Sequence, residues 1–226
     1  MSHFNAHIEV LPPAQRALWP SLRAVTTLSF VLYGGTAVGL RLGHRASIDF
    51  DFFSNAPLDR DALNEALPFL AQAQVLQDHS HTRSVVVTLI ENAPVKLSFF
   101  GNLHLGRIGI PERTHDDVLD VASLEDLMAF KLAVLSQRVE AKDYVDVAAM
   151  VRAGASLERG LAGARAIYGS QFQPCESLKA MTYFEEGDLT TLSEADRDTL
   201  RVAASKVREI PSVSLASPHF ALGPLG

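Results

Sequence analysis

The chain has 226 residues, of which 47% are hydrophobic and 20% are charged. This composition excludes an intrinsically disordered chain, and the length allows one large domain or two small ones with a buried core. The net charge of −6 excludes non-specific nucleic-acid binding driven by bulk charge. The single cysteine, Cys175, excludes an intramolecular disulfide and a multi-cysteine zinc site.

The first half of the chain alternates between helical and strand-like segments. Asn92 and Pro94 suit the turn of a hairpin between two of the strands. The clearest strand covers 48–53, where Ile48, Phe50 and Phe52 are expected to face the core. Hydrophobic periodicity and turn residues predict helices over 14–28, 36–42 and 59–70, and strands over 30–33, 48–53, 73–76, 84–90, 95–99 and 107–110.

After Pro111 the pattern becomes helical. Ser123 is followed three residues later by Asp126, a spacing typical of a helix capping box. We therefore predict an α+β fold, with a first domain over 1–115, a helical region over 116–210 and a loose tail over 211–226. The helices of the second half are predicted over 124–137, 141–151, 157–168, 175–184 and 195–209.

No segment predicts export or membrane insertion. The first eight residues lack a basic region followed by an apolar run, so we expect no signal peptide. The uncharged stretch between Arg23 and Arg41 is interrupted by threonines and glycines, which favours a strand and turn over a membrane span. We expect a cytoplasmic protein with no membrane partner.

Asp49 and Asp51 are two residues apart on the predicted strand over 48–53. The two-residue period of a strand directs both carboxylates to one face. Two neighbouring carboxylates favour a divalent cation between them, and oxygen ligands suit Mg²⁺ or Mn²⁺. The alternative is the solvated face of an amphipathic edge strand.

Gly34, Gly35 and Thr36 lie between a predicted strand and a predicted helix. Glycines at a helix N-terminus let backbone N–H groups approach a phosphate, and the Thr36 hydroxyl adds a donor. An ordinary tight turn is the alternative. A phosphate-binding turn followed about a dozen residues later by the two aspartates suits a complex of metal and nucleotide.

Two motifs in this order resemble the nucleotidyltransferase family of AbiEii/AbiGii-type toxins, within the DNA polymerase β-like superfamily. The first motif consists of Gly34-Gly35-Thr36-Ala37, Leu40, and His44-Arg45-x-Ser47-x-Asp49-x-Asp51. The second consists of Leu124-Glu125-Asp126-Leu127, Lys131, Arg138, and Lys142-Asp143-x-x-Asp146, and Leu178-Lys179-Ala180-x-x-x-Phe184 is a weaker third patch.

The resemblance implies a nucleotidyltransferase-like mixed β-sheet flanked by helices, with the helical region completing the active site. It implies transfer of a nucleoside monophosphate from an NTP with Mg²⁺ or Mn²⁺. Relatives act as toxins of toxin–antitoxin and phage-defence systems, and some modify tRNA. We therefore expect tRNA or another RNA as acceptor and an antitoxin protein as partner.

The second motif supplies further candidate site residues. Lys131 is expected to neutralise triphosphate charge, and Arg138, seven residues later, is expected to share its helix face. By similarity to the family, Asp146 is a catalytic acid that activates the acceptor or orients Lys131, and Lys142 and Asp143 join the nucleotide site. The alternative for Lys142 and Asp146 is a surface ion pair between neighbouring helical turns.

Arg45 and Ser47 precede the two aspartates, and Ser47 shares their parity on an extended chain. Arg45 is expected to contact phosphate or to pair with one of the aspartates. Ser98 stands where the superfamily often places a third metal-binding acid, and a serine cannot replace a carboxylate as a charged ligand. Either Asp146 supplies the missing acid, or the second metal is absent, or activity is reduced. Two alternatives to an RNA-modifying enzyme also remain open. One is a catalytically weak NTP-binding or interaction module, and the other is a nucleotidyltransferase with a small-molecule acceptor.

Overall fold

A computed structural model describes residues 2–90 and 93–222, and its chain folds into two compact units. The sheet unit comprises Met1–Leu105, Ile110–Ala122 and Pro218–Gly226. The helical unit comprises Gly106–Gly109 and Ser123–Ser217. The chain enters the helical unit briefly at Gly106–Gly109, enters it again at Ser123 and returns to the sheet unit at Pro218.

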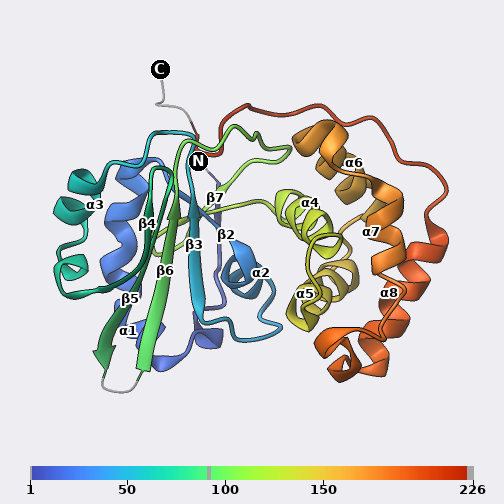
Figure 1. The fold of residues 1–226 in the computed structure, drawn as a ribbon, viewed down its shortest axis with the longest axis horizontal. Coiled ribbons are helices and arrows are strands. Elements are labelled where there is room, and N and C mark those ends of the chain that lie inside the picture. Colours follow the sequence, from blue (N-terminus) through green and yellow to red (C-terminus); the bar gives the residue numbers. More distant parts are fainter. Residues whose placement is uncertain (1, 91–92, 223–226) are drawn as a thin grey trace. The chain divides into compact units, whose positions relative to one another are not determined.

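The sheet unit is built on an eight-stranded mixed sheet in the order β1-β7-β8-β2-β3-β6-β5-β4 (Figure 1). Strand β3 lies near the middle, antiparallel to β2 and parallel to β6. The strands are β1 (His3–Phe4), β2 (Val31–Tyr33), β3 (Asp49–Phe53), β4 (Gln74–His79), β5 (Thr82–Ile90), β6 (Ala93–Phe100), β7 (Glu112–Thr114) and β8 (Asp120–Val121).

The core of the sheet unit gathers on one face of β3. Phe50 and Phe52 are fully buried; Phe52 stacks on Phe99 of β6 with ring centroids 5.2 Å apart, and Trp19 lies 6.3 Å from Phe50. Burial of such aromatic side chains contributes about 1.5–3 kcal/mol each. The helical elements of this unit are α1 (Pro13–Leu18), the 3₁₀ segment Trp19–Leu28, α2 (Gly34–Leu42), α3 (Arg60–Ala66) and the 3₁₀ segment Pro68–Gln72.

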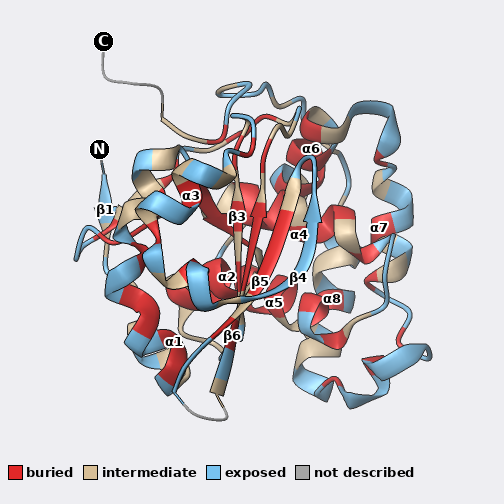
Figure 2. Cartoon of the chain, turned by 60° about the vertical axis from the view of Figure 1, so that its left-hand side comes forward, coloured by how far each residue is buried: buried red, intermediate tan, exposed pale blue. Residues whose placement is uncertain are grey.

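The other face of β3 carries its polar residues, and the outer strand β4 is exposed along its whole length (Figure 2). Phe50 and Phe52 confirm the expected alternation of the strand. The expectation for Ile48 is wrong: it is 67% exposed, because the strand begins at Asp49 and the chain before it has left the sheet.

The helical unit is assembled around α4, which packs on α5, α6 and α7. Ser123 caps α4 by accepting a hydrogen bond from the backbone N–H of Asp126, as the capping box predicts. The Asp126 carboxylate in turn accepts the backbone N–H of Ile108 at 2.7 Å and so holds residues 106–109 to this unit. The helices are α4 (Leu124–Leu135), α5 (Ala141–Arg152), α6 (Leu157–Tyr168), α7 (Pro174–Ala180) and α8 (Glu194–Lys206).

The segment expected to be a loose tail is anchored at Phe220, which is fully buried in the sheet unit. Its ring lies 5.2 Å from that of Tyr33, and its backbone N–H donates to the Asn55 side chain at 2.7 Å. The prediction failed here because a single aromatic residue in a Ser- and Pro-rich segment gives no periodic signal. Residues 223–226 lie outside the described part of the chain.

The expected α+β class is confirmed, with a mixed sheet flanked by helices and followed by helices. The strand expected over 107–110 is wrong: Arg107 forms only an isolated bridge with Ser217. The hairpin between β5 and β6 is confirmed, although Asn92 of its expected turn lies outside the described residues. Among the described residues, no helix has both the length and the apolar character that crossing a membrane requires.

Five of the expected helices end earlier than predicted, and two of these, over 124–137 and 195–209, end only two or three residues early, at Leu135 and Lys206. The other three differ more. The one over 14–28 becomes 3₁₀ after Leu18, the one over 59–70 changes to 3₁₀ after Leu67, and the one over 175–184 ends at Ala180. Pro20 and Pro68 each lie in the first turn of the 3₁₀ segment concerned, because proline lacks the N–H that would continue an α-helix. The short strands β1, β7 and β8 were not predicted, since two or three residues carry too little periodicity.

Candidate active site

Asp49 and Asp51 occupy the polar face of β3, and both are partly exposed. The strand alternation therefore places the two carboxylates on one face, as the sequence predicts. Within the part of the chain that the structure describes, the Asp49 carboxylate has no hydrogen-bond or ion-pair partner. Such a pair, with one carboxylate open, has the oxygen donors that a divalent cation requires.

Gly34 opens α2 directly after β2 and approaches Asp51 closely. Its φ of +72° lies in the left-handed region, and a Cβ built there would collide with the Asp51 carboxylate. A residue with a side chain at this position is therefore disfavoured twice, by backbone strain and by the collision. The glycine of the motif has a specific purpose: it makes room for the second aspartate.

Thr36 is buried in the first turn of α2, and its hydroxyl donates to the backbone carbonyl of Asp49. The side chain thus ties α2 to β3, which differs from the expected phosphate donor. Gly35 is partly exposed in the same turn. The backbone N–H groups at the start of this nine-residue helix remain suited to bind an anion.

Arg45 and Ser47 lie in the loop between α2 and β3, and both are partly exposed. The Arg45 guanidinium donates to the backbone carbonyl of Ala46 at 2.9 Å. Arg45 and Ser47 belong to the segment that leads directly into Asp49 and Asp51, and all four residues lie in the sheet unit. Their assignment to the nucleotide stays a prediction.

In the helical unit, Lys131 of α4 is held between two carboxylates of α5. Its Nζ lies 2.6 Å from Asp143 Oδ1 and 2.6 Å from Asp146 Oδ2. The Lys131 side chain is only 9% exposed, and both aspartate side chains are fully buried. A buried lysine with two carboxylates has its charge satisfied and its position fixed.

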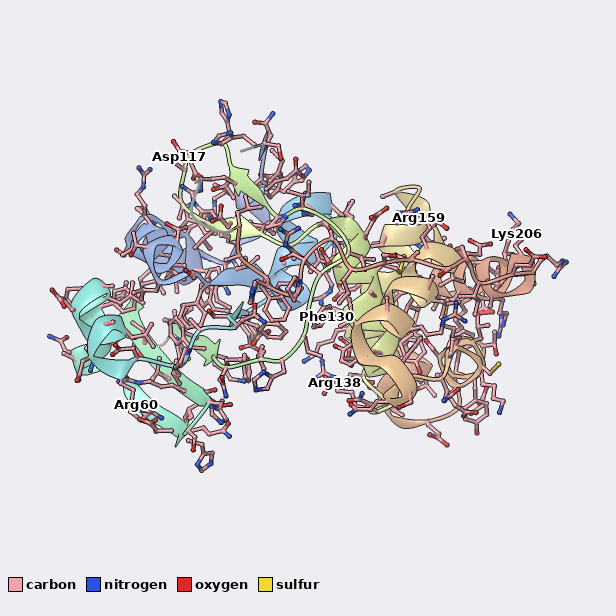
Figure 3. The ribbon with its side chains drawn as sticks, turned by 90° about the horizontal axis from the view of Figure 1, so that it is seen from above. Arg60, Asp117, Phe130, Arg138, Arg159 and Lys206 are labelled. Carbon is pink, nitrogen blue, oxygen red and sulfur yellow. The ribbon has the colours of Figure 1, made fainter. Side chains whose placement is uncertain are left out.

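Arg138, which Figure 3 labels, lies just beyond the end of α4 and contacts the same network. Its Nε donates to Asp143 Oδ2 at 2.9 Å and its second terminal nitrogen to Asp143 Oδ1 at 3.3 Å, and its side chain is 48% exposed. The expected stripe of Lys131 and Arg138 on one helix face is wrong, because the helix ends at Leu135. The two cations converge instead on one carboxylate.

The charge balance explains how Asp143 remains ionised inside the protein. Burial alone raises the pKa of its carboxyl, but the hydrogen bond from Arg138 and the charge of Lys131 outweigh burial and hold the pKa below its ordinary value. By contrast, burial raises the pKa of Asp126, and hydrogen bonds from Ser123 and two backbone N–H groups offset only part of that rise. Asp143 is therefore a fixed negative charge that positions the two cations.

Lys142 is exposed and pairs with Glu140, with Nζ 2.7 Å from Oε2. The surface ion pair considered between Lys142 and Asp146 is therefore wrong. Asp146 points inward and pairs with Lys131, whereas Lys142, four residues earlier on α5, is exposed and pairs with Glu140. Lys142 retains its expected exposure to an anionic ligand.

Ser98 lies on β6 directly opposite Asp51 in the register of the two parallel strands. It is buried, and its hydroxyl lies 3.2 Å from that of Ser84 on β5. In the same register Lys96 lies opposite Asp49, a juxtaposition that sequence reasoning missed. The alternation of Lys96 and Ser98 with buried Leu97 was the available signal, but only strand pairing shows which residues they face.

Strand β3 carries two side chains that could bind a metal ion, Asp49 and Asp51. The described ranges, 2–90 and 93–222, contain no group of three His, Cys, Asp or Glu side chains able to hold a metal ion. Asp49 and Asp51 fit a cation that takes its remaining ligands from water and from a bound phosphate, which is how Mg²⁺ is usually held. The residues of β3 can therefore hold a metal–nucleotide complex, while a cage made only of protein ligands is absent from the described residues.

Comparison with known proteins points to one family. The family model described as "Nucleotidyl transferase AbiEii toxin, Type IV TA system" matches residues 20–209. An uncharacterized protein of Aquifex aeolicus is 30% identical over 125 residues, which cover 54% of this chain and 58% of that relative. MenT4, a nucleotidyltransferase toxin of Mycobacterium tuberculosis H37Rv, has a similar fold, with a TM-score of 0.52, 15% identity, and coverage of 85% of this chain and 82% of that one.

Proposed function

Since this chain belongs to the AbiEii family of nucleotidyl transferase toxins, we propose that it transfers a nucleoside monophosphate from an NTP to an RNA acceptor. A bond forms between an acceptor hydroxyl oxygen and the α-phosphorus. The bond from the α-phosphorus to the bridging oxygen breaks, pyrophosphate leaves, and the hydroxyl proton passes to solvent. Such a transfer depends on positioning and on neutralising charge.

The observation that carries the proposal is the arrangement around β3. Asp49 and Asp51 share one face, and Gly34 leaves the space that the Asp51 carboxylate occupies. We assign Asp49 and Asp51 to a divalent cation, Mg²⁺ or Mn²⁺, which when bound neutralises charge on the transferred phosphate. The start of α2, at Gly34 and Gly35, is assigned to the terminal phosphates.

The helical unit supplies the other proposed roles. From the family resemblance alone we assign Lys131 and Arg138 to the charge of the triphosphate. Within the helical unit the Arg138 side chain is 48% exposed, whereas Lys131 is buried between two carboxylates. Of the two roles expected for Asp146, orienting Lys131 is favoured by their 2.6 Å ion pair and by the burial of the carboxylate. Asp143 is a positioning residue for both cations. Arg45, Ser47 and Lys142 remain candidate nucleotide contacts.

The family also implies partners. An antitoxin protein that restrains the activity is the proposed protein partner, and tRNA is the proposed acceptor. The use of cellular NTPs leads us to propose the cytoplasm as the site of action. Because the match spans little more than half of the Aquifex relative, these assignments rest on the family and on the residues of β3, α4 and α5.

The test is incorporation of each labelled NTP into total bacterial RNA with Mg²⁺ or Mn²⁺. We expect label on tRNA-sized RNA with the native chain and none with Asp49→Asn or Asp51→Asn. The matched control is Asp61→Asn, an exposed carboxylate in the first turn of α3. Equal incorporation by both β3 variants would refute the metal assignment.

A second candidate function is favoured by Ser98. With no third acid beside Asp51, the chain would bind NTP and an interaction partner but catalyse weakly. NTP binding without label on any RNA would favour this module. Label on a small molecule in the same extract would identify a small-molecule nucleotidyltransferase instead.

A further inference from the structure

Strand β6 runs parallel to β3 and beside it (Figure 1). Lys96 is in register with Asp49, and Ser98 is in register with Asp51. Residues in register on neighbouring strands point to the same face, and the strands lie about 4.7–4.9 Å apart. The neighbours of the two carboxylates on β6 are therefore a cation and a hydroxyl.

Ser98 is unsuited to a metal role. It is 1% exposed, and its hydroxyl lies 3.2 Å from that of Ser84, on the next strand. The two residues that follow Asp51 across the sheet, Ser98 on β6 and Ser84 on β5, are therefore a neutral pair whose hydroxyls contact each other. Two-metal sites hold two divalent ions about 3.5–4 Å apart. Beside Asp51, strand β6 adds no carboxylate that would offset the charge of a second ion.

Lys96 brings positive charge to the same face. It is partly exposed, and among the described residues it has no hydrogen-bond or ion-pair partner. A partly exposed lysine without a partner, one strand from Asp49, repels a second cation and attracts an anion. Its long side chain allows the ammonium to reach beyond the sheet face toward a ligand.

We propose that this site takes a single divalent cation, between Asp49 and Asp51, and that Lys96 binds substrate phosphate in place of a second ion. This inference rests on the proposed function, because it presupposes that Asp49 and Asp51 bind the cation of an NTP complex. Lys96 is then a phosphate-binding residue supplied by the sheet unit. The negative charge of the two carboxylates on β3 is compatible with one divalent ion beside the Lys96 ammonium of β6.

The first measurement is the number of ions bound, by titrating the full chain with Mn²⁺ and following the electron paramagnetic resonance signal of free Mn²⁺. We expect one ion per native chain and none with Asp49→Asn combined with Asp51→Asn. Two ions per native chain would overturn the inference and leave the proposed function intact. No ion at all would refute the metal assignment of the proposed function, and this inference with it.

The second measurement isolates Lys96 through NTP affinity, determined by calorimetry at saturating Mn²⁺ with a non-hydrolysable NTP analogue. Loss of a charge-assisted phosphate contact in Lys96→Ala is expected to weaken binding about tenfold or more, with most of the affinity retained in Lys96→Arg. Lys206→Ala, at the exposed end of α8, is the matched control. Unchanged affinity in a folded Lys96→Ala chain would overturn the role of Lys96.

A designed variant tests the same idea in reverse. Lys96→Glu replaces the cation by a carboxylate beside Asp49, and we expect the Mn²⁺ count to rise from one to two. Because Lys96 is partly exposed, this variant avoids placing a charge at buried Ser98. A count that stays at one in the folded variant would contradict the view that Lys96 limits the site to one ion.

Discussion

Two pairs of aspartates in this chain have the same chemistry and opposite environments. Asp49 and Asp51 lie on the partly exposed face of a strand, and the Asp49 carboxylate has no partner in the described chain. Asp143 and Asp146 are buried on a helix and clamp Lys131 at 2.6 Å. We call Asp49 and Asp51 the open pair, because the Asp49 carboxylate is open to a cation from solution. Asp143 and Asp146, which already share Lys131, are the closed pair.

The difference teaches that the secondary structure carrying two nearby aspartates decides whether they face solvent together or enclose a buried cation. A strand with a two-residue period directs neighbouring acids outward together. A helix that carries acids three residues apart directs them to one side, where they surround a single ammonium. The following substitutions test this division, from the largest expected effect to the smallest.

Removing the cation of the closed pair should have the largest effect on stability. Lys131→Ala leaves the buried carboxylates of Asp143 and Asp146 without their shared partner. We expect the free energy of unfolding to fall by about 3–5 kcal/mol, measured by urea denaturation. Arg138 still contacts Asp143, so that carboxylate keeps one of its two cations in the variant.

The matched control is Lys142→Ala, which removes an exposed ion pair of the same unit and should change stability by less than about 0.5 kcal/mol. A Lys131→Ala chain with an unchanged free energy of unfolding would contradict the view that Asp143 and Asp146 depend on Lys131 as their buried cation. This result also matters for binding studies, because a loss of NTP affinity in Lys131→Ala has meaning only where the chain remains folded.

Filling the space beside the open pair should have an intermediate effect. Gly34→Ala strains a backbone with φ of +72° and forces the new Cβ against the Asp51 carboxylate. We expect a loss of about 1–3 kcal/mol in thermal or urea unfolding, together with weaker Mn²⁺ binding. Gly154→Ala is the control, since its φ is +91° but nothing lies within 4 Å of the added Cβ. Mn²⁺ binding that is equally strong in both variants would show that Asp51 does not depend on Gly34.

The sequence predicted the class of fold and the open pair well, because both depend on local periodicity. The alternation Asp49-Phe50-Asp51-Phe52 determines which residues are buried once the strand exists. Gly34 and the start of α2 follow from turn chemistry that is also local. These features need only neighbouring residues, so a single sequence is sufficient.

The closed pair and the neighbours on β6 could not be predicted in the same way. The contact of Lys131 with Asp143 depends on how α4 packs against α5, and the expected helix-face stripe with Arg138 failed because the helix ends at Leu135. The register that brings Lys96 beside Asp49 joins segments almost fifty residues apart. Such pairings come from tertiary structure, which a periodic pattern does not encode.

The smallest stability effect is expected at the open pair itself, and it completes the comparison. Asp49→Asn removes a partly exposed carboxylate that has no partner among the described residues, while the backbone carbonyl that accepts from Thr36 is retained. We expect the free energy of unfolding to change by less than about 0.5 kcal/mol in the absence of metal, measured by urea denaturation. With Mn²⁺ present, the native chain should gain stability by ligand linkage and the variant should not. A large loss in the metal-free variant would instead make Asp49 a structural residue, and the contrast with the Asp143–Lys131–Asp146 clamp would disappear.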